Sequence, residues 1–501
     1  MKAHTVRRVI VAGAVAAMVL IAVVAASAYW LFSRDGFRRA LESQATSWIG
    51  VPVRIGAARA TFLPRIAVQL RDIRVGDPAG LILDTVELAA DLRPLFGGRI
   101  ENADVLVSDS RIDMPLPFAL PEPADAGASA VPAAPVRIVS IRSIALRDVR
   151  LRSRDREIVV SADSTLDDTT LAIRRFDAES GRTTLAVEGV VALSPRIDAQ
   201  LHAAANRLDL DELVALVAAF TPDSTGKDRR DGPGSGPRIT AGISAGEATA
   251  GAVRMRQFKT ELTLDGDAIA LNRLGFEMFG GRYEGSVAAR LGSPLSARLE
   301  SRIADLDAAQ LATFGGVADT ITGRLSGAGT FTGSGADVTE LLRNARGNGT
   351  AAIVDGSIRR LHLVRTVVLF FGRPAPDAGD ATDRFDRLDV TFSLANRVLR
   401  AQALSLQSAD ADMVGTGSLS LATDALDGRV DVMLSEKLSA QAGTDLYRYT
   451  REGNRVVLPA SIGGTLPAPR LTIDAGAAVK RGLRNEIERR MKDLFEGVGR
   501  R

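Results

Sequence analysis

The sequence predicts a mainly β protein: an N-terminal transmembrane helix, then an elongated, curled, repeating β-sheet with a few short α-helices and a C-terminal amphipathic helix. Three observations lead to this fold class. Apolar and polar residues alternate with a period of two in many segments, as in strands with one covered face. One uncharged apolar stretch, Val9–Phe32, is long enough to cross a bilayer. Segments with helical spacing are short, except at the C-terminus.

The apolar stretch reads VIVAGAVAAMVLIAVVAASAYWLF. As a helix it would span about 36 Å, enough for a hydrocarbon core of about 30 Å. We expect an uncleaved anchor with aromatic residues at the membrane–water interface. The alternative is a signal peptide cleaved after Ala28, but the apolar run continues beyond that site. The anchor residues are Val9, Val11, Leu20, Tyr29, Trp30 and Phe32.

The basic residues that flank this stretch do not orient it. Lys2, Arg7 and Arg8 precede it, and an equal number of arginines follow it closely. A short tail before a large C-terminal body favours a body on the far side of the membrane. We therefore expect everything after Ser33 to be extracytoplasmic.

Composition limits the function classes. The chain is 46% hydrophobic and 25% charged, which is typical of globular proteins. Its net charge is +3 and no basic block is present, so we expect no nucleic-acid partner. The sequence has no cysteine, which excludes disulfides and thiolate metal sites within it. Its three histidines lack a second ligand type at a useful spacing, so we expect no metal and no cofactor.

Strand patterns begin at Arg65–Arg71, where Ile66, Val68 and Leu70 alternate with less apolar residues. Similar alternation recurs along most of the chain. The other expected strands lie in Leu81–Leu92, Ile100–Ile112, Val136–Leu151, Ile158–Leu171, Thr183–Ala203, Phe258–Leu264, Leu295–Ile303 and Val430–Leu434.

Short helices are expected between these strands. They lie in Gly36–Ile49, Asp209–Phe220, Asp305–Phe314, Asp337–Arg346 and Arg359–Phe371. The second and third both follow a strand and begin with Asp-Leu-Asp, whose carboxylates can satisfy free helix N–H groups. The sequence Phe-Gly-Gly-Arg also occurs twice before a strand, ending at Arg99 and Arg282. These recurring segments predict internal repetition of a structural unit.

Two segments rich in proline, glycine and polar residues interrupt the strand patterns. The predicted organisation is a cytoplasmic tail (1–8), the anchor (9–32), a helix and β segment (33–114), a linker or loop (115–135), a β-groove segment (136–220), a flexible loop (221–237), a C-terminal β region (238–474) and a C-terminal helix (475–501).

The sequence has no evident active site. Ser224–Lys227 matches Ser-x-x-Lys but lies in the segment expected to be flexible. The glycine-rich run Gly327–Gly333 precedes a helix but lacks the βαβ context of a phosphate-binding loop. We therefore expect that this protein is not an enzyme.

The expected sheet has one apolar face, and the expected helices are too few to cover it. Two sheets could cover each other in a sandwich. Alternatively, one curled sheet could leave its apolar face as a groove for acyl chains. Shielding a sixteen-carbon chain from water is worth about 12 kcal/mol, at about 0.8 kcal/mol per CH₂. The candidate groove-lining residues are Val68, Leu70, Leu262, Leu264, Leu299, Ile303, Leu404, Leu406, Val430 and Val432.

The C-terminal segment Ala475–Phe495 has an apolar stripe at helical spacing. The stripe suits packing on the end of the sheet. Because the segment is also rich in lysine and arginine, it would alternatively suit an anionic membrane surface or a partner at the groove mouth. The stripe consists of Val479, Leu483, Ile487, Met491 and Leu494.

Several motifs together resemble the AsmA family of inner-membrane-anchored periplasmic proteins. They are the anchor, the segment Trp48–Val53 before the first strands, the Phe-Gly-Gly-Arg turns, and a C-terminal block containing Gly333–Gly347, Asp355-Gly356, Phe385–Leu388, Gly415–Leu419 and Ile462–Pro469. The resemblance implies a repeating β-groove fold related to TamB and chorein-type bridge-like lipid-transfer proteins, with no catalytic residues to carry over.

The resemblance also implies a location and a role. The expected location is the inner (cytoplasmic) membrane, single-pass, with the body in the periplasm. The expected role is non-enzymatic phospholipid binding or transport that supports outer-membrane assembly. Partners would be phospholipid acyl chains, the inner membrane and outer-membrane or envelope assembly proteins. The alternative is a structural assembly factor that regulates protein targeting to, or insertion in, the outer membrane without conducting lipid.

Overall fold

The computed structural model describes residues 38–39, 42–43, 45–46, 49–61, 66–77, 79–91, 99–114, 116, 137–138, 140–167, 169–220, 237–359, 361–371, 382–441 and 450–498. The predicted anchor Val9–Phe32, with the six residues singled out in it, lies outside these ranges. Among the residues described, no helix is both long and apolar enough to cross a membrane.

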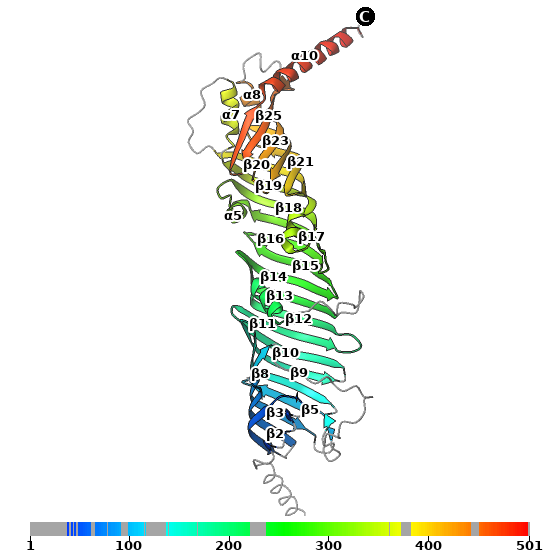
Figure 1. Ribbon diagram of the computed structural model, residues 1–501. Helices are drawn as coiled ribbons and strands as arrows, with labels where there is room; N and C mark the ends of the chain where they lie inside the picture. Colours follow the sequence, from blue (N-terminus) through cyan, green and yellow to red (C-terminus); the bar gives the residue numbers. More distant parts are fainter. Residues whose placement is uncertain are drawn as a thin grey trace, which may run out of the picture. The chain divides into compact units, whose positions relative to one another are not determined.

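The chain forms two compact units, Met1–Arg254 and Met255–Arg501, and both are mainly β, as predicted (Figure 1). The elements of unit 1 are β1 (Val53–Thr61), β2 (Ile66–Gly76), β3 (Ala79–Ala90), β4 (Arg99–Ile100), β5 (Ala103–Ser108), β6 (Arg111–Met114), β7 (Arg137–Ile138), β8 (Ile141–Ser153), β9 (Arg156–Asp167), β10 (Thr170–Ser180), β11 (Thr183–Ala192), β12 (Asp198–Asp209), α4 (Leu210–Phe220) and β13 (Arg238–Ala250).

The sheet of unit 1 is mixed. Most neighbouring strands are antiparallel, whereas β5 and β6 run parallel to β8, and β12 runs parallel to β13. Parallel neighbours need a crossover connection of about a dozen residues or more. The two breaks seen in the sequence, 115–135 and 221–237, fall in the β6–β8 and β12–β13 connections. Each break therefore lies in a connection between two parallel strands, in place of the short turn that joins antiparallel neighbours.

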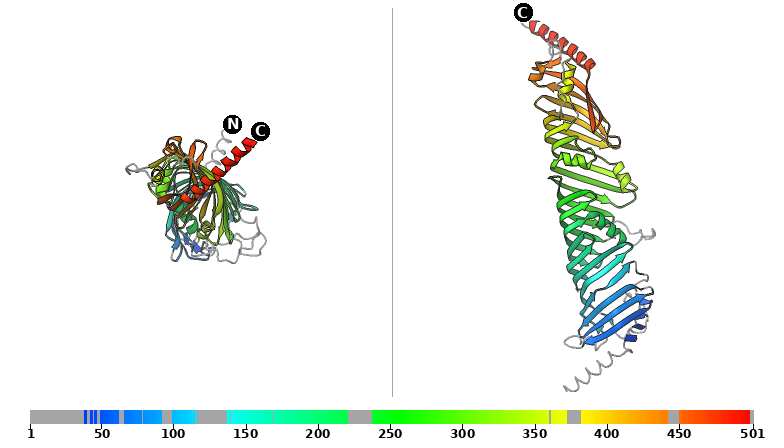
Figure 2. Two further views of the ribbon diagram at one scale, coloured as in Figure 1. Left: turned by 90° about the horizontal axis from the view of Figure 1, so that it is seen from above. Right: turned by 90° about the vertical axis from the view of Figure 1, so that its left-hand side faces the viewer.

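Unit 2 begins within β14 and is antiparallel throughout the strand pairs described. Each strand from β14 to β22 pairs with the next along the chain, and β23 then pairs with β25. Figure 2 shows these strands stacked in order. The elements are β14 (Val253–Asp265), β15 (Ala268–Met278), β16 (Gly281–Arg290), β17 (Leu295–Asp307), α5 (Ala308–Phe314), β18 (Ile321–Gly335), α6 (Val338–Arg343), β19 (Arg346–Arg359), α7 (Leu363–Phe370), β20 (Thr382–Ala395), β21 (Val398–Gln407), β22 (Ala411–Ser420), β23 (Leu426–Leu434), α8 (Glu436–Ser439), β24 (Arg451–Glu452), β25 (Arg455–Thr465), β26 (Ala468–Ile473) and α10 (Ala475–Val498).

One predicted helix begins later than expected, because its first residues belong to a β-bulge. Asp305 lies in β17 with a left-handed φ of 56°. The register shifts by one residue between Ile303 and Leu306, so both side chains lie on the same face. The helix α5 then begins at Ala308, and the Asp307 carboxylate accepts hydrogen bonds from the backbone N–H groups of Ala309 and Gln310.

The two Asp-Leu-Asp segments have similar roles but are offset: the first aspartate caps the helix in the first copy, and the last aspartate caps it in the second. In the first copy the Asp209 carboxylate accepts from the N–H groups of Asp211 and Glu212, as Asp307 does at α5. The preceding leucines, Leu208 and Leu306, are both buried. Each copy therefore ends a strand, buries a leucine and caps a short helix.

Candidate functional site

One row of apolar residues crosses unit 2 from β14 to β23. Each member lies directly opposite the next in the strand register, so their side chains share a face. At about 4.8 Å between strands, the row extends for roughly 43 Å. We call it the half-buried row. It consists of Leu262, Leu271, Val287, Leu299, Phe331, Gly347, Leu394, Leu399, Leu419 and Leu426.

The burial of this row is uniform. Every member is half-buried, and none belongs to the buried core of the unit. In a closed sandwich, facing side chains would bury such residues almost completely. Here the side chains instead keep part of their surface exposed to solvent. The row is therefore a continuous apolar surface that the described protein does not seal.

Aromatic rings lie against glycines on this face. A Cβ placed on Gly329 would lie 2.8 Å from the Phe331 ring, and one on Gly349 would lie 2.8 Å from the Phe392 ring. The two rings stack with centroids 6.4 Å apart. Because glycine has no side chain, each ring can approach the backbone closely. The apolar face therefore consists of flat aromatic rings as well as branched aliphatic side chains.

A second aromatic group lies at the start of unit 2. The rings of Phe276 and Tyr283 stack with centroids 4.6 Å apart, and Phe258 continues the stack. Burial raises the pKa of the Tyr283 hydroxyl. The shift follows from the partial burial of this side chain among its aromatic neighbours.

The opposite face of the same strands is polar. Arg298 and Glu300 form an ion pair at 2.9 Å on β17, and Arg387 and Asp389 form one at 2.6 Å on β20. All four side chains are largely exposed. Among the residues described, no cluster of three or more His, Cys, Asp and Glu is arranged to hold a metal.

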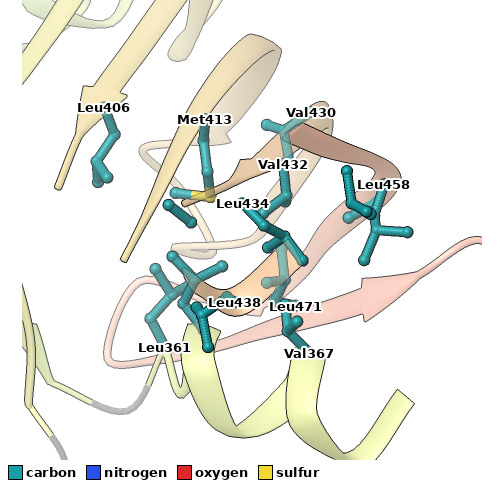
Figure 3. Close-up of a cluster of buried hydrophobic side chains, with 14 of the residues drawn as sticks. Leu361, Val367, Leu406, Met413, Val430, Val432, Leu434, Leu438, Leu458 and Leu471 are labelled. Carbon is teal, nitrogen blue, oxygen red and sulfur yellow. The ribbon is translucent and has the colours of Figure 1, made fainter. Parts of the chain in front are cut away.

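A second row of apolar residues on the same face is half-buried at its first strands and fully buried at its last ones. We call it the closing row: Leu325, Ile353, Leu388, Leu406, Met413, Val432 and Leu458. The first three are half-buried, whereas the last four are buried. Leu363 of α7 belongs to the same buried cluster. So do Val367 of α7 and Leu438 of α8, which Figure 3 shows beside the strand residues. Two short helices therefore convert the end of the face into an ordinary core.

Polar contacts hold the two closing helices. The Asp383 carboxylate of β20 accepts a hydrogen bond from the Leu363 N–H at the start of α7, at 3.0 Å. Burial raises the pKa of Asp383, although its backbone hydrogen bonds oppose the shift. At α8, the buried Ser439 hydroxyl accepts from the Val456 N–H at 2.9 Å. Both helices are thus tied to the strands that they cover.

Unit 1 contains a comparable row by itself. It runs in register through Leu70, Val86, Val107, Leu146, Ala162, Phe176, Val187, Ala203 and Ile243. All except Ala162 are half-buried. A separate buried cluster of Val53, Ile55, Ile73 and Val75 closes β1 and β2, with Ile49 and Val51 packed against it.

The candidate groove-lining residues divide between these environments. Leu262 and Leu299 belong to the half-buried row, and Leu264, Ile303 and Leu404 are half-buried beside it. Val68 and Leu70 are half-buried in unit 1. Three candidates lie instead in the closed core, because α7 and α8 cover them: Leu406, Val430 and Val432.

Sequence reasoning missed most of the half-buried row. Leu271, Val287 and Phe331 join it only through the cross-strand register. Each belongs to a segment with period-two alternation, which was the available signal. Alternation does not say which residues of different strands align.

The family model described as "AsmA family" matches residues 223–404. No curated protein and no solved structure matches the chain significantly. The matched range contains four of the motifs that carried the resemblance: the second Phe-Gly-Gly-Arg turn, Gly333–Gly347, Asp355-Gly356 and Phe385–Leu388. The later motifs lie outside it. It also contains the half-buried row from Leu262 to Leu399.

Proposed function

We propose that this chain, whose residues 223–404 belong to the AsmA family, binds phospholipid acyl chains along the half-buried row of unit 2. In this proposal the stretch Val9–Phe32 anchors the protein in the inner membrane and the body lies in the periplasm. There it supports transport of phospholipid toward the outer membrane and outer-membrane assembly. No bond is made or broken in this role.

The observation that carries the proposal is the continuity of the half-buried row. Its members are aliphatic or aromatic residues and one glycine, without a charge from β14 to β23. An acyl chain lying on this surface would be shielded along its length, and each shielded CH₂ is worth about 0.8 kcal/mol. The polar headgroup would remain at the water-exposed edge, because no buried charge or cation site on the row would hold it.

The two faces of β16 provide a matched test. Val287 points into the row, whereas its neighbour Ala288 is exposed on the polar face, opposite Arg298. An aspartate at position 287 would place a charge against the acyl chain, which costs several kcal/mol of lipid binding. An aspartate at position 288 would face water. Leu299→Asp, opposite Val287, is a second variant on the row.

The experiment measures co-purifying phospholipid by mass spectrometry and thermal stability on the full-length protein. Val287→Asp and Leu299→Asp are expected to lose most of the lipid while melting within a few degrees of wild type. Ala288→Asp is expected to keep both. If the row variants melt far below Ala288→Asp, the row is a closed core. If they keep lipid, or if wild type carries none, the structural assembly factor replaces the lipid-binding function.

A further inference from the structure

The C-terminal helix α10 presents an apolar stripe to solvent. The exposed fractions of Val479, Leu483, Ile487 and Met491 are 65%, 61%, 59% and 51%. These residues recur every four positions, so they follow one side of the helix. At these four residues the stripe does not pack on the sheet, which was one of the two expectations from the sequence. The side chain of Leu494, the fifth residue of the expected stripe, lies outside those that the structure describes.

A different side of α10 holds it to the sheet. Ala478 is buried, and the Arg481 guanidinium forms ion pairs with Asp431 of β23 at 2.7 Å and Glu452 of β24 at 3.0 Å. Beyond this attachment the helix projects away from the strands (Figure 1). The attachment fixes the base of α10 and leaves the stripe free to meet another surface.

The charges beside the stripe are basic where the side chains are described. Lys480 and Arg484 are both exposed, one turn apart. The charge of Arg481 is balanced by its ion pairs with Asp431 and Glu452, so we do not count it among the cations beside the stripe. An amphipathic helix with lysine and arginine next to apolar residues is complementary to an anionic lipid surface, because the apolar side enters the headgroup–acyl boundary while the cations meet lipid phosphates.

We propose that α10 docks unit 2 on an anionic bilayer, with the stripe Val479, Leu483, Ile487 and Met491 inserted at its surface. This docking goes beyond lipid binding along the half-buried row and does not require it. A second copy of this chain or a protein partner would also cover an apolar stripe, but neither accounts for the exposed basic residues Lys480 and Arg484 beside it.

The absence of cysteine from the sequence allows a site-specific test on the full chain. An environment-sensitive fluorophore is attached to Ile487→Cys, and to Val414→Cys on β22 as the control, since Val414 is also exposed. The protein is held in phosphatidylcholine nanodiscs, and vesicles of phosphatidylglycerol or of phosphatidylcholine are added. The 487 label is expected to shift to the blue only with phosphatidylglycerol, and the 414 label not at all.

Two variants complete the test. Leu483→Asp is expected to weaken binding to phosphatidylglycerol vesicles at least tenfold, with unchanged melting because the side chain is exposed. The double variant Lys480→Gln/Arg484→Gln is expected to weaken it and to reduce its salt dependence. Membrane docking would be overturned if the label at position 487 responded equally to both lipids or did not respond at all. A blue shift without vesicles that depends on protein concentration would also overturn it.

Discussion

Leu299 and Val432 lie on the same apolar face of unit 2, each in a strand with period-two alternation, yet their surroundings differ. Leu299 is half-buried among neighbours on its own face. Val432 is 0% exposed, with α7 and α8 in its cluster. The strand pattern is the same at both places. What differs is whether a short helix covers the face.

This comparison teaches that coverage, rather than strand pattern, decides whether an apolar row is a surface or a core. Leu363, Val367 and Leu438 contribute the covering side chains at the closed end. At the half-buried end, α5 contacts β17 and β18, and Leu306 at the end of β17 is buried together with Ala308 and Ala312 of this helix. The helix α6 also packs on β17 and β18, with Leu341 against Gly333, but no member of the half-buried row joins the buried cluster.

The largest expected effect is that of a charge placed in the closed core. Val432→Asp buries a carboxylate among the apolar side chains of this cluster, at a cost of more than about 4 kcal/mol. Unit 2 is expected to unfold at room temperature or to melt far below wild type. Leu299→Asp is the matched variant and should melt near wild type. Similar melting of the two variants, measured by calorimetry, would erase the distinction between core and surface.

Removing part of the cover should cost less. Val367→Ala creates a cavity beneath α7, since Val367 is 0% exposed, and is expected to lower the free energy of unfolding by about 2 kcal/mol. Leu369→Ala, on the same helix but 52% exposed, should change it by less than about 0.5 kcal/mol. Urea denaturation checks both. Equal effects would mean that α7 does not seal the core.

Removing the N-terminal cap of α5 should lower the free energy of unfolding by a smaller amount than Val367→Ala does. Asp307→Ala removes the acceptor for two helix N–H groups and is expected to cost about 1 kcal/mol. Hydrogen bonds from the Gln310 side chain and from the backbone lower the pKa of Asp307. The cap's contribution is therefore present above the unfolded-state pKa and is lost as pH falls through the lowered value. The gap between wild type and variant should narrow on acidification, and a constant gap would contradict this role.

Asp383, which caps α7, should show a smaller effect of the opposite sign. Its pKa is raised by burial, so the folded protein favours the protonated form. Stability from this group is greatest at low pH and falls as pH rises from about 3.9, the ordinary aspartate pKa, through the raised value. Asp383→Asn keeps an acceptor for the Leu363 N–H without the charge. Its stability relative to wild type should rise over this pH range, and a flat difference would show that Asp383 is solvated.

Local elements were largely predictable from the sequence, because their signals are local. The caps Asp307 and Asp337 and the alternation around Leu299 indicated α5, α6 and β17 close to where they lie. The resemblance to the AsmA family followed from sequence motifs, some of which lie in the range 223–404 that the family model matches. These features depend on residues only a few positions apart.

The candidate site was only partly predictable, because it depends on distant residues. Val430 and Val432 alternate as Leu299 does, but their burial depends on α7, some 60 residues earlier in the chain. The bulge at Asp305 shifts the register without a strong sequence signal. The alignment of Leu262, Leu271 and Val287 follows from pairing that alternation cannot specify.

The central claim, that the half-buried row binds acyl chains, is tested most directly by photolabelling. The full-length protein is incubated with a phospholipid that carries a diazirine on its acyl chain, irradiated and mapped by mass spectrometry. We predict adducts on row residues such as Leu271, Leu299 and Phe331, and none on Val432 in the closed core or on Arg298 of the polar face. Adducts spread equally over both faces, or absent from the row, would contradict the claim.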